Sequence, residues 1–303
     1  MENSDDSWPN KAQHVIDTYG GNLVKSAIMV AAFHPCTVVR VLVQVGHEPI
    51  APVKSEQWFP TKKAVWCYPN VFKYMGHITR EKGYGGLYTA LAPRLLHDLV
   101  NKTVGNALLE HMKDGEEEEE DVDSTSALAF AQETMKLACV KTASYVISYP
   151  FHVISVRMIA QFAGGASDYT STMSSLREIY REEGVGGFFK GVIPGLVGEL
   201  VMLSVFRVIN RVIRAYLLTD ELKQVQDMKV ASSSMANYCA NMCAQPFQVV
   251  ANVMCVNDTE LNVGKPPFVP VYEHWTECWS SLGAIGRNRG SSLLRRTLPY
   301  HSI

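Results

Sequence analysis

The chain of 303 residues consists largely of one sequence unit that occurs three times, with a period of about 100 residues. Each unit opens with a proline that is followed by a β-branched and aliphatic run. These prolines are Pro35, Pro150 and Pro246. A turn and a second proline follow later in each unit, at Pro93, Pro194 and Pro299. Because two independent markers recur with one period, the chain is predicted to fold as three copies of a single structural unit.

The repeats and the charge distribution predict one domain with a polar extension. We expect a polar N-terminal segment at residues 1–20 and a single domain at residues 21–303. Within the domain the predicted parts are repeat one (21–113), an acidic linker (114–123), repeat two (124–218) and a truncated repeat three (229–303). The linker holds eight of the chain's 30 acidic residues and is expected to be solvated.

Five segments are long enough to cross a bilayer as helices. They are Leu23–Val45, Arg94–Met112, Ser126–Phe162, Ile193–Leu218 and Val230–Asn257. Four of them carry charged residues, and the fifth carries several asparagines, so none is uniformly apolar. With 47% hydrophobic and 19% charged residues, composition alone leaves a soluble helical repeat protein as an alternative.

The distribution of charge between the predicted ends of the helices favours a membrane protein. If the five segments span, the loops and terminus on one face sum to −12, and those on the other face sum to +4. A soluble repeat protein gives no reason for such a split. Charged residues inside the spans are then expected to face the protein interior or a water-filled cavity.

The repeated unit resembles that of the mitochondrial carrier family. The signature of that family is Pro-x-Asp/Glu-x-x-Lys/Arg, a glutamine nine residues after the proline, a glycine-rich turn and an aromatic-basic-glycine element. The first repeat keeps Pro35, Arg40 and Gln44, and the second keeps Glu183-Gly184 and Phe189-Lys190-Gly191. The resemblance implies an all-α, three-fold pseudo-symmetric bundle around a polar cavity, with a short amphipathic surface helix in each repeat.

Two departures from the family pattern stand out. Carriers close one gate with ion pairs between residues two and five positions after the first proline. Here those positions are Thr37, His152 and Gln248, and Arg40, Ser155 and Ala251, so only one charge remains. In addition, four residues follow Pro299, which is about 6 Å of helix against a hydrocarbon core of about 30 Å. We therefore expect the sixth transmembrane helix to be lacking and the bundle to have a laterally open polar groove.

With these departures, and in the sequences of its second and third repeats, the chain resembles the mitochondrial carrier homologs of the outer membrane. The resemblance implies a multi-pass mitochondrial outer-membrane insertase for tail-anchored and other α-helical membrane proteins, which uses no nucleotide hydrolysis. It also implies docking of pro-apoptotic BH3 proteins and contact with membrane lipids. No enzyme activity, no cofactor and no nucleic-acid partner are expected. The sequence has neither a Walker-type glycine loop nor a metal-ligand cluster that would contradict a mechanism without nucleotide.

Helical periodicity predicts which polar residues line the groove. The candidates are Arg40, Gln44, Asp98, Asn106, Lys141, Tyr145, Glu199, Arg207, Asn237 and Asn241. Asp98 and Glu199 each lie five residues after the second proline of their repeat, which suggests a shared orientation. Alternatives remain, because Glu199 and Arg207 could pair with neighbouring helices and Arg40 could cap a polar network.

Two other functions remain open from the sequence. A divergent solute carrier would need a sixth helix and paired gate charges. A membrane scaffold or receptor without insertion activity would bind partners but leave insertion unchanged. Reconstitution of the purified chain in liposomes with a tail-anchored client separates the three functions.

Overall fold

The computed structural model describes residues 8–57, 63–114, 127–165, 169–213, 226–266, 269–293 and 296–297. Most of this chain is helical, as predicted. The five long helices are α1 (Trp8–Gln44), α3 (Leu91–Asp114), α4 (Ala127–Ala160), α6 (Val192–Val212) and α8 (Gln226–Val256). They coincide with the five segments expected to span. α1 begins inside the polar segment 1–20, and residues after Pro299, where a sixth helix was expected to be lacking, lie outside the described residues.

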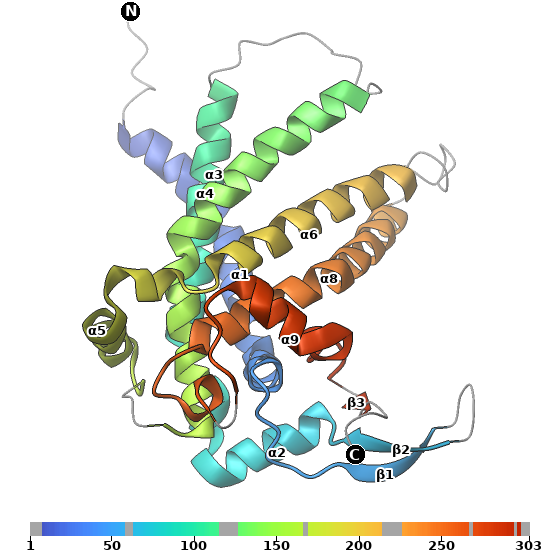
Figure 1. The fold of residues 1–303 in the computed structure, drawn as a ribbon. Coiled ribbons are helices and arrows are strands. Elements are labelled where there is room, and N and C mark those ends of the chain that lie inside the picture. The colour runs from blue at the N-terminus through green and yellow to red at the C-terminus, as the bar shows by residue number, and fades with distance from the viewer. Residues whose placement is uncertain are drawn as a thin grey trace, which may run out of the picture.

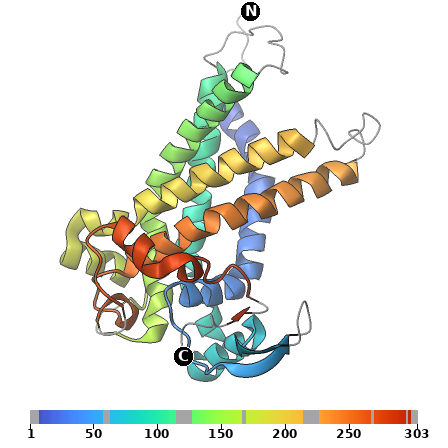
Figure 2. The same ribbon diagram turned by 45° about the vertical axis from the view of Figure 1, so that its right-hand side comes forward.

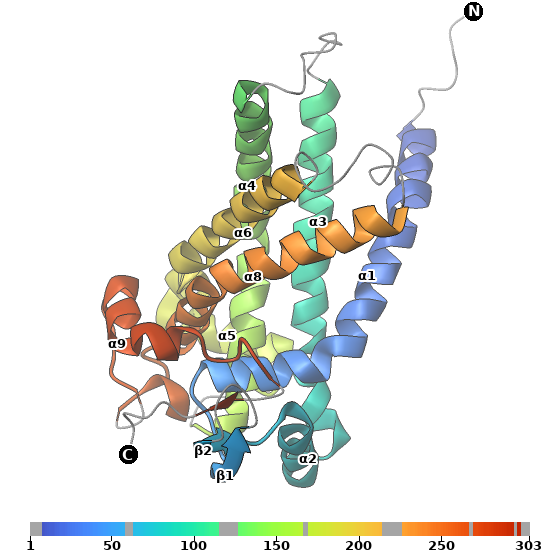
Figure 3. The same ribbon diagram turned by 90° about the vertical axis from the view of Figure 1, so that its right-hand side faces the viewer.

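Each of the three motif prolines lies inside a long helix. Pro35 is in α1, Pro150 is in α4 and Pro246 is in α8. Proline lacks an amide proton and its ring collides with the preceding turn, so it bends a helix rather than continuing it straight. Figure 3 shows α1 changing direction along its length.

Each repeat has a short helix after its first long helix. They are α2 (Val71–Lys82), α5 (Thr172–Glu183) and α9 (Trp275–Arg287). α2 begins at Asn70, whose side chain accepts a hydrogen bond from the amide of Lys73. α5 begins with a capping box between Ser171 and Ser174. These helices correspond to the amphipathic segments expected between the two prolines of each repeat.

The long helices form two arms that join at one end. α3 packs along α4, and α6 packs along α8. Figures 1 and 2 show the two pairs diverging from a common base, with α1 beside the first pair. The largest buried cluster lies in this base, where Leu42, Tyr149 and Ile154 are fully buried. The base therefore holds the arms together, and the space between them narrows toward it.

A small sheet lies beside the base, and helical periodicity gave no sign of it. The strands β1 (Val53–Gln57) and β2 (Lys63–Tyr68) come from the insertion of the first repeat, and β3 (Arg296–Thr297) comes from the end of the third. The sheet is antiparallel with the order β1-β2-β3, and Cys67 pairs with Thr297. The end of the described chain is thus tied to the first repeat.

A buried ion pair holds the elements of the second repeat together. The Arg157 side chain is fully buried in α4, and its Nη2 lies 2.9 Å from Oε2 of Glu183. Its Nε donates to the carbonyl of Cys255 on α8, at 2.9 Å. Lys190 Nζ lies 3.1 Å from the same Glu183 oxygen. One carboxylate therefore joins α4 to the turn before α6, and Arg157 extends the link to α8.

Two stretches of the described chain are long and apolar enough to cross a membrane by length and composition. They are Gly20–Gln44 and Thr172–Val212. The long helices also expose large apolar side chains, such as Ile28 on α1, Val208 on α6 and Tyr238 on α8. An apolar exterior of this kind suits contact with lipid, whereas charged residues inside a membrane need a protein or water-filled surrounding.

Candidate functional site

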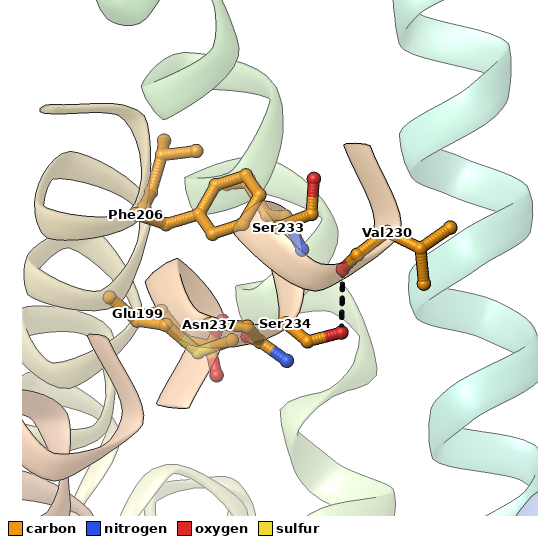
Figure 4. Close-up of a pocket in the computed structure, with 9 residues that line it drawn as sticks. Glu199, Phe206, Val230, Ser233, Ser234 and Asn237 are labelled. Carbon is orange, nitrogen blue, oxygen red and sulfur yellow. Dashed lines mark hydrogen bonds between the residues drawn. The ribbon is translucent and has the colours of Figure 1, made fainter. Parts of the chain in front are cut away.

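One cavity lies between α4, α6 and α8 and has a volume of about 680 Å³. We call it the large hollow. It is lined by Lys141, Glu199, Met202, Leu203, Phe206, Val230, Ser233, Ser234 and Asn237. Figure 4 shows Glu199 and Phe206 across from the residues of α8. Its surface therefore combines two charged groups, hydroxyls and an amide with apolar side chains.

The polar groups of α8 in the large hollow follow one another along one face of the helix. Ser234 donates a 2.8 Å hydrogen bond to the carbonyl of Val230, one turn earlier. The amide of Asn241 donates to the carbonyl and side chain of Asn237 at 2.8 and 3.2 Å. These bonds stay within α8, so the side chains of Ser234 and Asn241 are held by their own helix.

The smaller cavity lies deeper, where the helices converge, and has a volume of about 170 Å³. We call it the small hollow. It is lined by Thr37, Arg40, Val41, Gln44, Arg94, His97, Tyr145, His152, Gly195, Glu199, Gln248, Ala251 and Asn252. Glu199 lines both cavities, so its side chain stands where they meet.

A chain of neutral hydrogen bonds crosses the small hollow. Asn252 Nδ2 donates to Gln44 Oε1 at 2.7 Å, and Asn252 Oδ1 lies 3.0 Å from His152 Nε2. Since the Asn252 oxygen can only accept, His152 carries a proton on Nε2. The chain joins α4, α8 and α1, one long helix from each repeat. It runs at the level where carriers are expected to form gate ion pairs.

Six of the predicted groove residues line the two hollows. Arg40, Gln44 and Tyr145 line the small hollow, Lys141 and Asn237 line the large hollow, and Glu199 lines both. Gln44 and Tyr145 are buried, whereas the residues Arg40, Lys141 and Asn237 are exposed. The residues that periodicity selected on α1, α4, α6 and α8 thus lie around the two hollows.

Asp98 and Arg207 are engaged with neighbouring side chains. Asp98 accepts a 2.6 Å hydrogen bond from Ser26 on α1 and forms an ion pair with Lys102 at 3.0 Å. Arg207 forms an ion pair with Glu133 on α4, and its guanidinium lies 5.0 Å from the ring centre of a phenylalanine on α4. Pairing with a neighbouring helix was one of the alternatives from the sequence for Arg207, and it describes that residue. Asp98 contacts a neighbouring helix through Ser26.

The remaining two candidates lie beside the hollows. Asn241 bonds back to Asn237, as described above, and Asn106 is half-buried on α3. Neither residue is among those that line the two cavities.

Several lining residues were not among those predicted for the groove, and they include Arg94, His97 and Asn252. Arg94 directly follows Pro93, and Asn252 is six residues after Pro246. The comparison with carriers considered only the residues two and five positions after the first proline, so it did not include these positions. A search for every polar residue within two turns of a motif proline would have found them.

Three helical repeats around polar hollows define a membrane protein of the carrier type. Residues 127–221 match the family described as mitochondrial carrier protein. The chain is 35% identical over 274 residues to mitochondrial carrier homolog 2 of Bos taurus, a match that covers 88% of this chain and 90% of the relative. It is 31% identical to mitochondrial carrier homolog 1 of Mus musculus, with 88% and 73% covered. The chain therefore belongs to the mitochondrial carrier homologs within the mitochondrial carrier family, and it is a mitochondrial membrane protein.

The position of the family match agrees with the structure. The matched residues cover repeat two, which holds the buried Arg157–Glu183 pair. In the first and third repeats the position equivalent to Arg157 is occupied by Leu42 and Val253. The second repeat thus has a buried charged contact at a position where the other two repeats carry apolar residues.

Proposed function

We propose that this protein inserts tail-anchored and other α-helical proteins into the mitochondrial outer membrane without nucleotide hydrolysis. The observation that carries the proposal is the mixed lining of the large hollow. Lys141, Glu199 and the hydroxyls of α8 provide polar contacts for a hydrophilic tail, and Met202, Leu203 and Phe206 provide apolar contacts beside them.

The polar contacts address the costly step of insertion. A tail-anchored client must pass its short polar C-terminal tail through hydrocarbon, and each charge at the centre costs about 3 kcal/mol or more. Hydration and hydrogen bonding in a polar hollow lower that cost. Transfer of the client's apolar segment of about 20 residues into lipid is itself favourable, so the step needs no nucleotide.

The proposed lateral exit for the client lies between α8 and α1. These helices meet near their C-terminal ends, where Asn252 bonds to Gln44. Figures 1 and 2 show their N-terminal parts well apart. A client helix could leave between them, because their exposed faces carry apolar residues such as Val24, Phe33 and Met242.

We also propose that pro-apoptotic BH3 proteins dock on this protein. An amphipathic helix binds by laying its apolar face into a hydrophobic groove. The apolar side chains Met202, Leu203 and Phe206 offer such a surface on α6. Competition between a BH3 peptide and a tail-anchored client for the purified protein tests whether the two use the same surface.

The function is tested by reconstitution of the purified protein in liposomes with a tail-anchored client. We expect insertion without nucleotide, and a changed rate for Arg40→Glu and for Glu199→Lys, because each reverses a charge that lines a hollow. Arg181→Glu on the exposed face of α5 is the matched control, expected to insert at the parent rate. If both hollow variants also insert at the parent rate, the assignment to the hollows is wrong.

A divergent solute carrier is the second candidate function. The observation in its favour is 24% identity to nicotinamide adenine dinucleotide transporter 2 of Arabidopsis thaliana, over 92% of this chain and 74% of the relative. Uptake of that dinucleotide by the same liposomes, with no client insertion, would support the carrier. Client binding with neither insertion nor uptake would identify a scaffold.

A further inference from the structure

We propose that the small hollow is a carboxylate site, and that its ligand is the free C-terminal α-carboxylate of the client during insertion. This inference rests on the proposed insertase function and names the chemical group that the protein recognises. It follows from the charges, the hydrogen bonds and the size of the cavity.

The small hollow has an excess of positive charge. Its lining contains two guanidinium groups, Arg40 from α1 and Arg94 from α3, and one carboxylate, Glu199 from α6. The nearby carboxylate of Asp98 is already bound to Ser26 and Lys102. In the described part of the chain, the side chains of Arg40 and Arg94 make no hydrogen bond or ion pair with another residue.

Four of the neutral lining residues are held by hydrogen bonds. Gln44, Asn252 and His152 form the hydrogen-bonded chain, and His97 Nδ1 lies 3.0 Å from the carbonyl of Ser148. These groups hold the shape of the cavity and leave the two guanidinium groups unpaired. Two like charges facing one partly dehydrated space repel each other, and an anion between them would remove that repulsion.

The hydroxyl of Tyr145 supplies a further donor. Tyr145 is buried and lines the small hollow, and its hydroxyl makes no hydrogen bond among the described residues. An arginine fork binds a carboxylate through two parallel hydrogen bonds, and a phenol adds a third from another direction. The set of donors therefore fits a planar carboxylate.

The small hollow is large enough for the end of a client chain but too small for a helix. An α-helix with side chains is about 10 Å across, so a volume of about 170 Å³ cannot hold even one helical turn. A terminal residue in an extended conformation can enter. Since Glu199 lines both cavities, a tail in the large hollow could reach the small one past this side chain.

The experiment compares two synthetic versions of one tail-anchored client, one with a free C-terminal carboxylate and one with a C-terminal amide. The proteins are the parent, Arg94→Gln, Arg40→Gln and the exposed control Arg181→Gln. In liposomes with the parent or the control, the free acid should insert about tenfold faster than the amide, as expected for loss of hydrogen bonds to a charged group. In Arg94→Gln the ratio of the acid rate to the amide rate should fall to about one.

Each other outcome has a defined meaning. Equal insertion of acid and amide by the parent overturns the carboxylate site and leaves the insertase function intact, whereas insertion of neither client contradicts the insertase function itself. An equal loss for both clients in Arg94→Gln shows a structural role for that residue and also overturns the site. If Arg94→Gln does not fold, Arg40→Gln at the exposed rim gives the same comparison.

A final arm distinguishes the client terminus from a free solute. Succinate is added to the purified parent protein without a client, and the midpoint of thermal unfolding is measured. A shift that is lost in Arg94→Gln, combined with discrimination between acid and amide clients, supports the proposal. A shift without that discrimination shows a site for a soluble carboxylate and overturns the assignment to the client.

Discussion

Asn252 on α8 and Gln44 on α1 are 208 positions apart in the chain, and their side-chain amides share a buried hydrogen bond of 2.7 Å. His152 on α4 continues the link through Asn252 Oδ1. One helix from each repeat is thus joined by neutral groups at the level of the expected ion-pair gate. Neutral bonds between buried groups need no counter-charge, so this end of the bundle can stay closed without a cycle of charges.

Replacement of Asn252 by alanine should destabilise the fold. It leaves the buried groups of Gln44 and His152 without this partner, which costs about 1–3 kcal/mol of unfolding free energy. Denaturant unfolding of the purified protein measures the loss. Asn241→Ala is the control on the same helix, because Asn241 is exposed and bonds back to Asn237. Equal stability of the parent and Asn252→Ala would contradict a structural role for the chain.

Replacement of Arg157 by methionine should have the larger effect. The substitution removes a fully buried guanidinium and leaves Glu183 with Lys190 alone, at a cost of about 3–5 kcal/mol. The exposed pair between Arg181 and Glu178 provides the control, since Arg181→Met should cost less than about 1 kcal/mol. If the two variants had similar unfolding midpoints, burial would not set the strength of the Arg157 contact.

The thiol of Cys278 on α9 should resist alkylation in the folded protein. Burial raises its pKa to about 12, so at pH 8 only about one thiol in ten thousand is the reactive thiolate. Cys139 and Cys243 are exposed and should be modified first by N-ethylmaleimide in detergent. Mass spectrometry of the peptides measures the order. After denaturation Cys278 should react like the others, and rapid reaction before denaturation would argue against the packing of α9.

Gly195 should not tolerate a side chain. An added Cβ would overlap the hydroxyl of Tyr145, across the contact between α6 and α4. Alanine normally favours a helix over glycine by about 1 kcal/mol, yet Gly195→Ala should lower the unfolding free energy by about 1–3 kcal/mol because the site is overpacked. Gly76→Ala on α2 meets no neighbouring atom and should be neutral or stabilising. The same unfolding assay compares the two, and a stable Gly195→Ala would refute the close approach.

Much of the helical framework could be predicted from local sequence. The prolines at 35, 150 and 246 mark three long helices. The apolar runs between charged loops predicted most ends of the five long helices to within a few residues. The exception is α1, which begins at Trp8 rather than near Leu23. Such agreement is expected because helix length and the position of a proline act through bonds within a few residues.

The candidate site could be predicted only in part. Periodicity places Lys141 and Tyr145 on one face of α4, and both line a hollow. It could not show that Asp98 would pair with Ser26, or Arg207 with Glu133, since each partner lies more than 70 positions away. A helical face gives a direction, and the neighbour found in that direction depends on how the helices cross.

The sequence by itself determined the number of repeats, the long helices and the loss of the charged gate positions, because repetition, periodicity and residue identity are local properties. Only the tertiary structure decided that Asn252, Gln44 and His152 form one hydrogen-bonded chain, and that Arg40 and Arg94 face a common cavity. It also placed β3 against β2. The hydrogen-bonded chain and the sheet join different repeats, and Arg40 and Arg94 lie on different helices of the first repeat. The distances between these helices are set by packing in the base rather than by any single segment.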